Sequence, residues 1–215
     1  MGFLQNKRNG INFAAAPSEM EVTMNSIDLM VEEHKNILGM LKVVRKACQK
    51  ILQGDEICFE DFEKMIDFIR NYADSHHHGK EEKFLFKEMV ANLGHIGNTL
   101  INHGMLVEHN LGRLYISELS DALERVNAGD EESKLDVIAN AVGYANLLTR
   151  HIGKEDEVVY TFAARKLSTE VLESVNQQTE DYEQEAEKQG IQAFYKELLR
   201  KLENKYLSQN KILKF

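Results

Sequence analysis

Six side chains of the types that bind metal ions recur as two matched sets in this sequence. The segment Met30–His34 is similar to Met105–His109, about 75 residues later. The segment His77–Glu82 is similar to His151–Asp156, at nearly the same offset. Each half of the chain therefore carries one histidine followed, after a similar interval, by a His-x-x-x-Glu pair. The repeat singles out His34, His77, Glu81, His109, His151 and Glu155.

This repeat predicts a dinuclear metal site. On a helix, residues i and i+4 differ by about 40° in direction, so a His-x-x-x-Glu pair can point at one interior position. Imidazole nitrogens suit iron, zinc or copper, and a carboxylate has two oxygens that can bridge two ions. Without a cation, a buried cluster of this composition would carry a large desolvation cost. From helix adjacency, we expect His34 and His77 to bind one ion, His109 and His151 the other, and Glu81 and Glu155 to bridge them.

The remaining histidines are not expected to bind the metal ions. At about 100° per residue, His76 and His78 project to either side of His77. A pairing of His78 with Glu82 is the alternative register. His103 lies about 120° around its helix from His109.

The composition predicts the helices that must position these side chains. One proline and 13 glycines in 215 residues leave few breakers, which favours long helices over a sheet-rich fold. Helical periodicity runs through about 26–53, 59–92, 98–127 and 131–166. Short connections force consecutive helices to run antiparallel. We therefore expect an all-α protein built on an up-down-up-down four-helix bundle.

The segments outside the bundle are predicted to differ from each other. Residues 1–24 contain the single proline and are expected to form an irregular N-terminal arm, ahead of a bundle over 25–166. Residues 167–215 are expected to form a C-terminal helical extension. Its last helix has an apolar stripe made of Ile191, Phe194, Tyr195, Leu198, Leu199 and Leu202. The stripe must pack on the bundle or on a second copy, as in a homodimer.

Charge and hydropathy argue against two classes of partner. There are 26 Lys and Arg against 35 Asp and Glu, a net charge of −9, which disfavours nucleic-acid binding. No stretch approaches the roughly 18 apolar residues that span a bilayer, and the N-terminus lacks a secretory signal pattern.

Cys48 and Cys58 match no thiol–metal motif and are expected to be free thiols. We expect a cytoplasmic protein.

The same residues resemble a known family. The stretches HHGKEEKFLF (77–86) and EHNLGR (108–113), with the His and His-x-x-x-Glu pattern, are similar to the hemerythrin-like, or HHE cation-binding, domain over about 26–166. The resemblance implies a four-helix bundle that holds two iron ions with an oxo or hydroxo bridge. Zinc or manganese would be substitutes. It also implies activity toward O₂, nitric oxide or peroxide, or in iron handling.

The chain departs from the oxygen-carrying members of that family. Those members have a further histidine one turn before the third-helix histidine, a position that is Met105 in this sequence. A thioether is a poor ligand for hard iron. The missing histidine leaves coordination positions open, which favours the sensor, repair or reactive branch over a reversible carrier.

Two further residues are predicted to lie near the metal ions. Tyr144 is seven residues before His151, about 20° from its direction, and is expected to reach the metal cavity. Arg113, four residues after His109, is expected to hydrogen-bond an oxygen ligand of the ions.

These observations rank three functions. The first is a di-iron protein that senses or reacts with O₂, NO or peroxide, whether or not it turns over a substrate. The second is a binding module for iron storage, iron delivery or metal sensing. The third is a structural bundle that dimerises. A ferritin-type site is disfavoured because it needs Glu-x-x-His, whereas this sequence has His-x-x-x-Glu.

Overall fold

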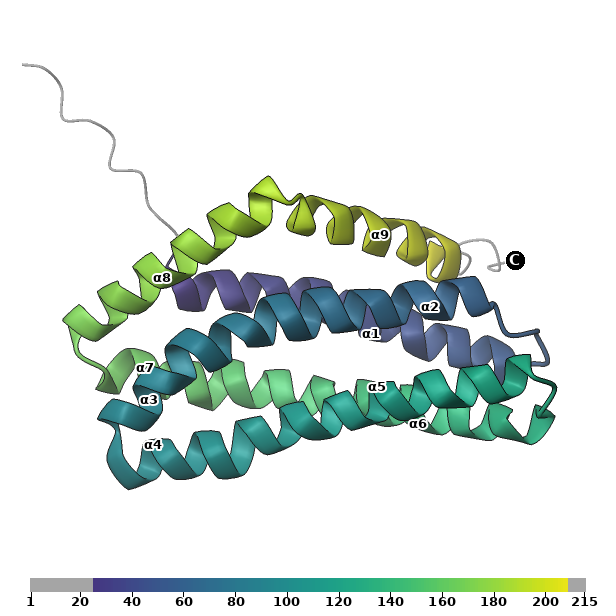
Figure 1. Cartoon of the computed structure of the whole chain (residues 1–215), viewed down its shortest axis with the longest axis horizontal. Coiled ribbons are helices and arrows are strands. Elements are labelled where there is room, and N and C mark those ends of the chain that lie inside the picture. The colour runs from purple at the N-terminus through teal and green to yellow at the C-terminus, as the bar shows by residue number, and fades with distance from the viewer. Residues whose placement is uncertain (1–24, 209–215) are drawn as a thin grey trace, which may run out of the picture.

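The computed structural model describes residues 25–208, and within this range the chain is helical without a strand. Four long helices run antiparallel along the molecule, as Figure 1 shows. The all-α prediction is confirmed. The predicted arm at 1–24 lies outside the described residues. Over 25–208, no helix combines the length and apolarity that a membrane crossing requires.

Three of the four long helices contain stretches of π-helix. The first helix is α1 (Ser26–Leu52). The second joins α2 (Phe59–Phe68), the π-helical segments η1 (Ile69–His78) and η2 (Glu81–Leu85), and α3 (Phe86–Asn92). The third joins α4 (Gly94–Leu100), the π-helical segment η3 (Ile101–Met105) and α5 (Leu106–Asn127). After the 3₁₀ turn η4 (Glu131–Ser133), the fourth joins α6 (Lys134–Lys154), the π-helical segment η5 (Glu155–Val159) and α7 (Tyr160–Lys166).

The turn between the second and third helices is shorter than the sequence predicts. Only Leu93 separates α3 from α4, so the third helix starts at Gly94 instead of near Asn98. Gly94 has φ +58°, a left-handed conformation that suits glycine. A Cβ atom on Gly97 would lie 2.3 Å from the carbonyl oxygen of Met89. Glycine at both positions therefore allows the two helices to meet at a tight corner.

The π-helical segments η2 and η5 begin at the two glutamates of the predicted site. The amide of Phe86 donates to the carbonyl of Glu81, and the amide of Tyr160 donates to the carbonyl of Glu155. These are i+5 bonds, which widen the helix locally and are frequent at functional sites. The repeat seen in the sequence is therefore also a repeat of backbone geometry.

The C-terminal helices α8 (Thr169–Lys188) and α9 (Ile191–Tyr206) form an arch over α1 and α2 (Figure 1). The bend lies at Gly190, which has φ +71°. Tyr195, Leu199 and Leu202 of the apolar stripe are buried in the same core cluster as α1 and α2 side chains. The stripe thus packs on the chain's own bundle, and the homodimer stays a prediction.

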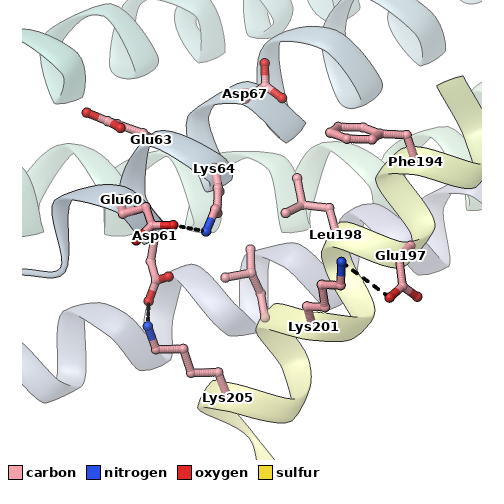
Figure 2. A pocket seen from close by; sticks show the side chains of 11 residues that line it. Glu60, Asp61, Glu63, Lys64, Asp67, Phe194, Glu197, Leu198, Lys201 and Lys205 are labelled. Atoms are coloured by element: carbon pink, nitrogen blue, oxygen red, sulfur yellow. Dashed lines mark hydrogen bonds and ion pairs between the residues drawn. The ribbon is translucent and has the colours of Figure 1, made fainter.

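Charged side chains flank the contact between α9 and α2. Figure 2 shows the surface groove between these helices, where Lys64 pairs with Glu60, and Lys201 with Glu197. Lys205 of α9 also pairs with Asp61 of α2, across the groove. The apolar contact of the stripe is therefore bordered by an ion pair between the end of α9 and α2.

Two apolar clusters divide the bundle along its length. One includes Ile37, Ala73 and Leu148, and the other includes Met30 and Val159. Along each long helix, the residues of the predicted site lie between these two clusters. A polar layer is thus enclosed at both ends by packed hydrophobic side chains.

The packing of α9 leads to a stability prediction. Leu202→Ala removes a side chain that is 3 % exposed, and we expect it to lower the free energy of unfolding by about 2–5 kcal/mol. The control Phe194→Ala removes a side chain on the same helix that is 60 % exposed, so we expect a change of about 0.5 kcal/mol or less. Urea unfolding followed by circular dichroism measures both. Equal small effects would contradict the docking of α9.

Candidate metal centre

The six residues of the sequence repeat lie together in the polar layer. His34, His77, Glu81, His109, His151 and Glu155 are each at most 1 % exposed. The histidines form two pairs. Nε2 of His34 is 2.9 Å from Nε2 of His77, and Nε2 of His109 is 3.0 Å from Nε2 of His151. The pairs are those that helix adjacency predicts.

These two separations match the geometry of shared coordination. Two nitrogens about 2.1 Å from one metal ion, at right angles to each other, are about 3 Å apart. A cation between the two nitrogens of each pair would therefore sit at an ordinary bond length from both.

The two glutamates lie between the histidine pairs. Oε1 of Glu155 is 2.9 Å from Nε2 of His151, while its Oε2 is 3.4 Å from Nε2 of His34. Oε2 of Glu81 is 3.9 Å from Nε2 of His77 and 3.6 Å from Nε2 of His109. Each carboxylate can thus reach both pairs, as a bridging ligand must.

Three carboxylate oxygens at the centre lack a hydrogen-bond donor. They are Oε2 of Glu81 and both oxygens of Glu155. A buried, unpartnered carboxylate oxygen is costly, and a divalent cation would satisfy it. The donor set therefore fits two metal ions.

An outer layer of carboxylates orients all four imidazoles. A carboxylate only accepts hydrogen bonds, so each Nδ1 carries the proton and each Nε2 is left free to face the centre. The Nδ1···O distances are 2.8 Å for His34–Asp156, 2.8 Å for His77–Glu33, 2.7 Å for His109–Glu82 and 3.0 Å for His151–Glu108.

The outer acids follow the same internal repeat as the inner residues. Glu33 and Glu108 each precede a histidine of the centre, and Glu82 and Asp156 each follow a glutamate of the centre. An outer acid and the inner ligand next to it therefore come from the same turn of a helix. Sequence reasoning named no partner for the imidazoles, although the repeat of these four acids was a signal that could have found them.

Tyr160 is a contact of the centre that sequence reasoning missed. Its hydroxyl donates to Oε1 of Glu81 at 2.5 Å, and its ring stacks on His34 with centroids 5.7 Å apart. The matching residue of the first half is Phe86, whose ring lies 5.9 Å from that of His109. Because phenylalanine has no hydroxyl, Glu155 receives no matching hydrogen bond, and only Glu81 has a tyrosine partner among the described residues.

His78, which is not expected to bind the metal ions, lies closer to the centre than its direction beside His77 suggests. Its ring is buried and stacks on His109, with centroids 3.8 Å apart and planes 11° apart. His78 is the last residue of the π-helical segment η1. His76 is buried too, but its Nε2 lies 3.2 Å from Glu33, in the outer layer.

Arg113 contacts the outer acids, whereas Tyr144 lies in the core of the bundle. Arg113 binds the carboxylates of Asp74 and Glu82, with contacts of 2.7 Å to each, so it braces acids of the outer layer. Tyr144 is buried against Gly112 and lines a cavity of about 180 Å³ that also borders His78 and His109. Tyr144 thus lines the same cavity as His109, and its reach to the metal ions stays a prediction.

A buried lysine links the outer layer to the C-terminal extension. Lys80 is 1 % exposed and pairs with both Glu33 of α1 and Glu183 of α8. Burial favours the neutral form of Glu33, but hydrogen bonds from His76 and His77 and the charge of Lys80 hold its pKa well below the usual value. The lysine that pairs with Glu33, the acid that orients His77, therefore also contacts α8.

Protons compete with cations for the centre. Burial opposes charge on His34, yet Asp156 and Glu155 raise its pKa to about 9, while burial lowers the pKa of His77 to about 4. Burial and the negative charge of Glu155 raise the pKa of Glu81 well above its usual value. Without metal ions, a proton on His34 therefore takes the place of a cation between the paired imidazoles.

This competition predicts a pH dependence of metal affinity. Because His34 keeps its proton up to about pH 9, a metal ion must displace it, and affinity should rise with pH by about tenfold per unit for each proton displaced. Anaerobic titration of metal-free protein with Co²⁺ at several pH values below 9 measures the slope. An affinity that does not change with pH over this range would contradict the assigned proton.

A comparison with known families agrees with this geometry. The sequence profile of the hemerythrin HHE cation-binding domain matches residues 25–163, well over half of the 215 residues. No curated protein and no solved structure matches the chain significantly. The matched region contains the six inner residues and the four outer acids but ends before α8.

Proposed function

The chain belongs to the hemerythrin HHE cation-binding domain family, and on that premise we propose that it holds two iron ions and senses or reacts with O₂, nitric oxide or peroxide. The observation that carries the proposal is the pairing of Nε2 atoms at 2.9 and 3.0 Å between imidazoles whose Nδ1 atoms all face carboxylates. Such nitrogens repel each other unless a cation or proton lies between them.

The distances support the ligand assignment of this proposal. His34 and His77 would hold one ion, His109 and His151 the other, with Glu81 and Glu155 shared between them. Imidazole and carboxylate together suit iron, and zinc or manganese could occupy the same donors. When bound, a pair of iron ions supplies electrons and open coordination positions for a small oxidant.

The surrounding residues prepare the centre for a small molecule. Burial between two apolar clusters excludes bulk water. The hydroxyl of Tyr160 holds a proton at Oε1 of Glu81, close to the centre. The cavity of about 180 Å³ beside His109 is walled by Ile116, Tyr144 and Leu148, which suits a diatomic molecule or peroxide better than a large substrate.

Metal sensing is the second candidate, and one contact favours it over simple storage. Lys80 joins Glu33, which orients His77, to Glu183 of α8, a helix beyond the family match. Loading of the centre could therefore alter how α8 docks. A structural bundle without metal is the least supported function, because it would leave the buried carboxylate oxygens unpaired.

The ligand assignment is tested by removal of single donors. Glu81→Ala and His151→Ala should each lose bound metal, because each deletes a donor that is fully enclosed. His103→Ala, which alters an exposed histidine on the third helix, is the matched control and should retain two metal ions per chain. Elemental analysis of protein from iron-supplied cells gives the ratios. Retention of two ions by either ligand variant would refute the assignment.

Reactivity is tested separately from binding. Anaerobic protein loaded with Fe²⁺ should change its optical spectrum when O₂ or NO is added, because open coordination positions remain after six protein donors have bound two ions. Exposure of the zinc-loaded protein is the control and should give no change. An unchanged spectrum with two irons bound would favour the metal-sensing or iron-storage function instead.

A further inference from the structure

A separate cluster of donor atoms lies behind the dinuclear centre, where α8 covers α1 and η1. Nε2 of His76 is 3.2 Å from Oε1 of Glu33 and 3.2 Å from Oε1 of Glu183. One ligand atom from each of these residues lies within 4.8 Å of the other two. Atoms that share one cation are about 3 Å apart, and one imidazole with two carboxylates is a donor set that suits a cation.

A lysine already supplies a positive charge to this cluster. The side chain of Lys80 is fully buried and pairs with both Glu33 and Glu183. Its Nζ also lies 3.3 Å from Nε2 of His76. The ammonium group therefore contacts all three donors, as a metal ion bound to them would.

The C-terminal extension helps to build the cluster. The rings of Tyr72 and Tyr182 both stack on the imidazole of His76, with centroids 5.7 and 5.6 Å away. Tyr182 belongs to α8, as Glu183 does, and its hydroxyl donates to the carbonyl of Ser75. The helix α8 thus supplies one donor and also a ring that supports another.

The second half of the repeat has the same lysine in a different setting. Lys154 corresponds to Lys80 and pairs with Glu108, but its side chain is 50 % exposed. Arg150, which is exposed, takes the place of His76. On this side of the bundle the lysine therefore belongs to a surface ion pair, whereas under α8 it lies in an enclosed set of donors.

We propose that the ammonium group of Lys80 is the resident cation of a third cation site, and that it limits the protein to the two metal ions of the centre. The count of two rests on the dinuclear site proposed above. Because the ammonium group is tethered to the chain, it fills the third site without the entropic cost of binding a free ion. A metal ion in the same place would have to displace a buried charge.

Occupation by lysine also preserves the orientation of His77. Oε2 of Glu33 accepts a hydrogen bond from Nδ1 of His77, while Oε1 of Glu33 faces Lys80. A divalent ion bound to Glu33 would compete for the negative charge that this hydrogen bond uses, and ligand orientation depends on such outer contacts. Lys80 is therefore a positioning residue for the centre as well as the residue that sets its metal count.

The test counts metal ions after the lysine is removed. Lys80→Ala leaves the imidazole and both carboxylates without a cation and makes room for an ion with water ligands. Anaerobic titration of the metal-free protein with Co²⁺, in competition with a chromophoric chelator, gives the number of ions bound. We expect two ions in the wild type and three in Lys80→Ala. Lys80→Gln, which also removes the charge, serves if the alanine variant does not fold.

Two further variants locate the third ion. Adding His76→Phe to Lys80→Ala removes the nitrogen donor but keeps a ring against the two tyrosines, so the count should return to two. Lys154→Ala is the matched control, because it removes the corresponding lysine from a surface pair, and it should bind two ions.

The possible counts separate this proposal from the dinuclear site. Three ions in the wild type, or two in Lys80→Ala, would overturn the role of Lys80 and leave the dinuclear site intact. Three ions in the double variant or in Lys154→Ala would place the third ion elsewhere, which also overturns it. Fewer than two ions in the wild type would contradict the dinuclear site itself.

Discussion

The structure depends on one constraint: four imidazoles and two carboxylates are buried at the same depth of a helical bundle, with free nitrogens facing each other at about 3 Å. Without a positive charge between them, such a cluster would oppose folding. In the metal-free chain, protons on His34 and Glu81 supply part of what a cation would. The polar layer is therefore tolerable in the core only as a site that some positive charge occupies.

The rest of the molecule serves to hold this layer. Two apolar clusters close it at both ends, and an outer set of acids orients each imidazole. Because each outer acid is the chain neighbour of an inner ligand, one turn of helix contributes to both layers. Each outer acid accepts a hydrogen bond from an imidazole on another helix, so these contacts link the four helices. Through Lys80, the extension α8 joins the same network, so a part of the chain outside the family domain contacts the support of the centre.

Sequence reasoning reached most of this arrangement because the signal was periodic and repeated. Helix spacing gave the bundle, the internal repeat gave the six inner residues, and helix adjacency gave their pairing. It missed side chains that the repeat and the helix spacing do not single out. His78 is buried with its ring stacked on His109, whereas the spacing placed it to one side of His77. Tyr160 escaped notice because the repeat has phenylalanine at the matching position, and Arg113 was assigned to a metal-bound oxygen but braces Asp74 and Glu82.

The central claim is that two cations lie between the paired imidazoles, and anomalous diffraction tests it most directly. Crystals of protein from iron-supplied cells, measured on both sides of the iron absorption edge, should show two anomalous peaks. One should lie between His34 and His77, and the other between His109 and His151. A map with the same six side chains directed inward and no anomalous peak among them would contradict the account.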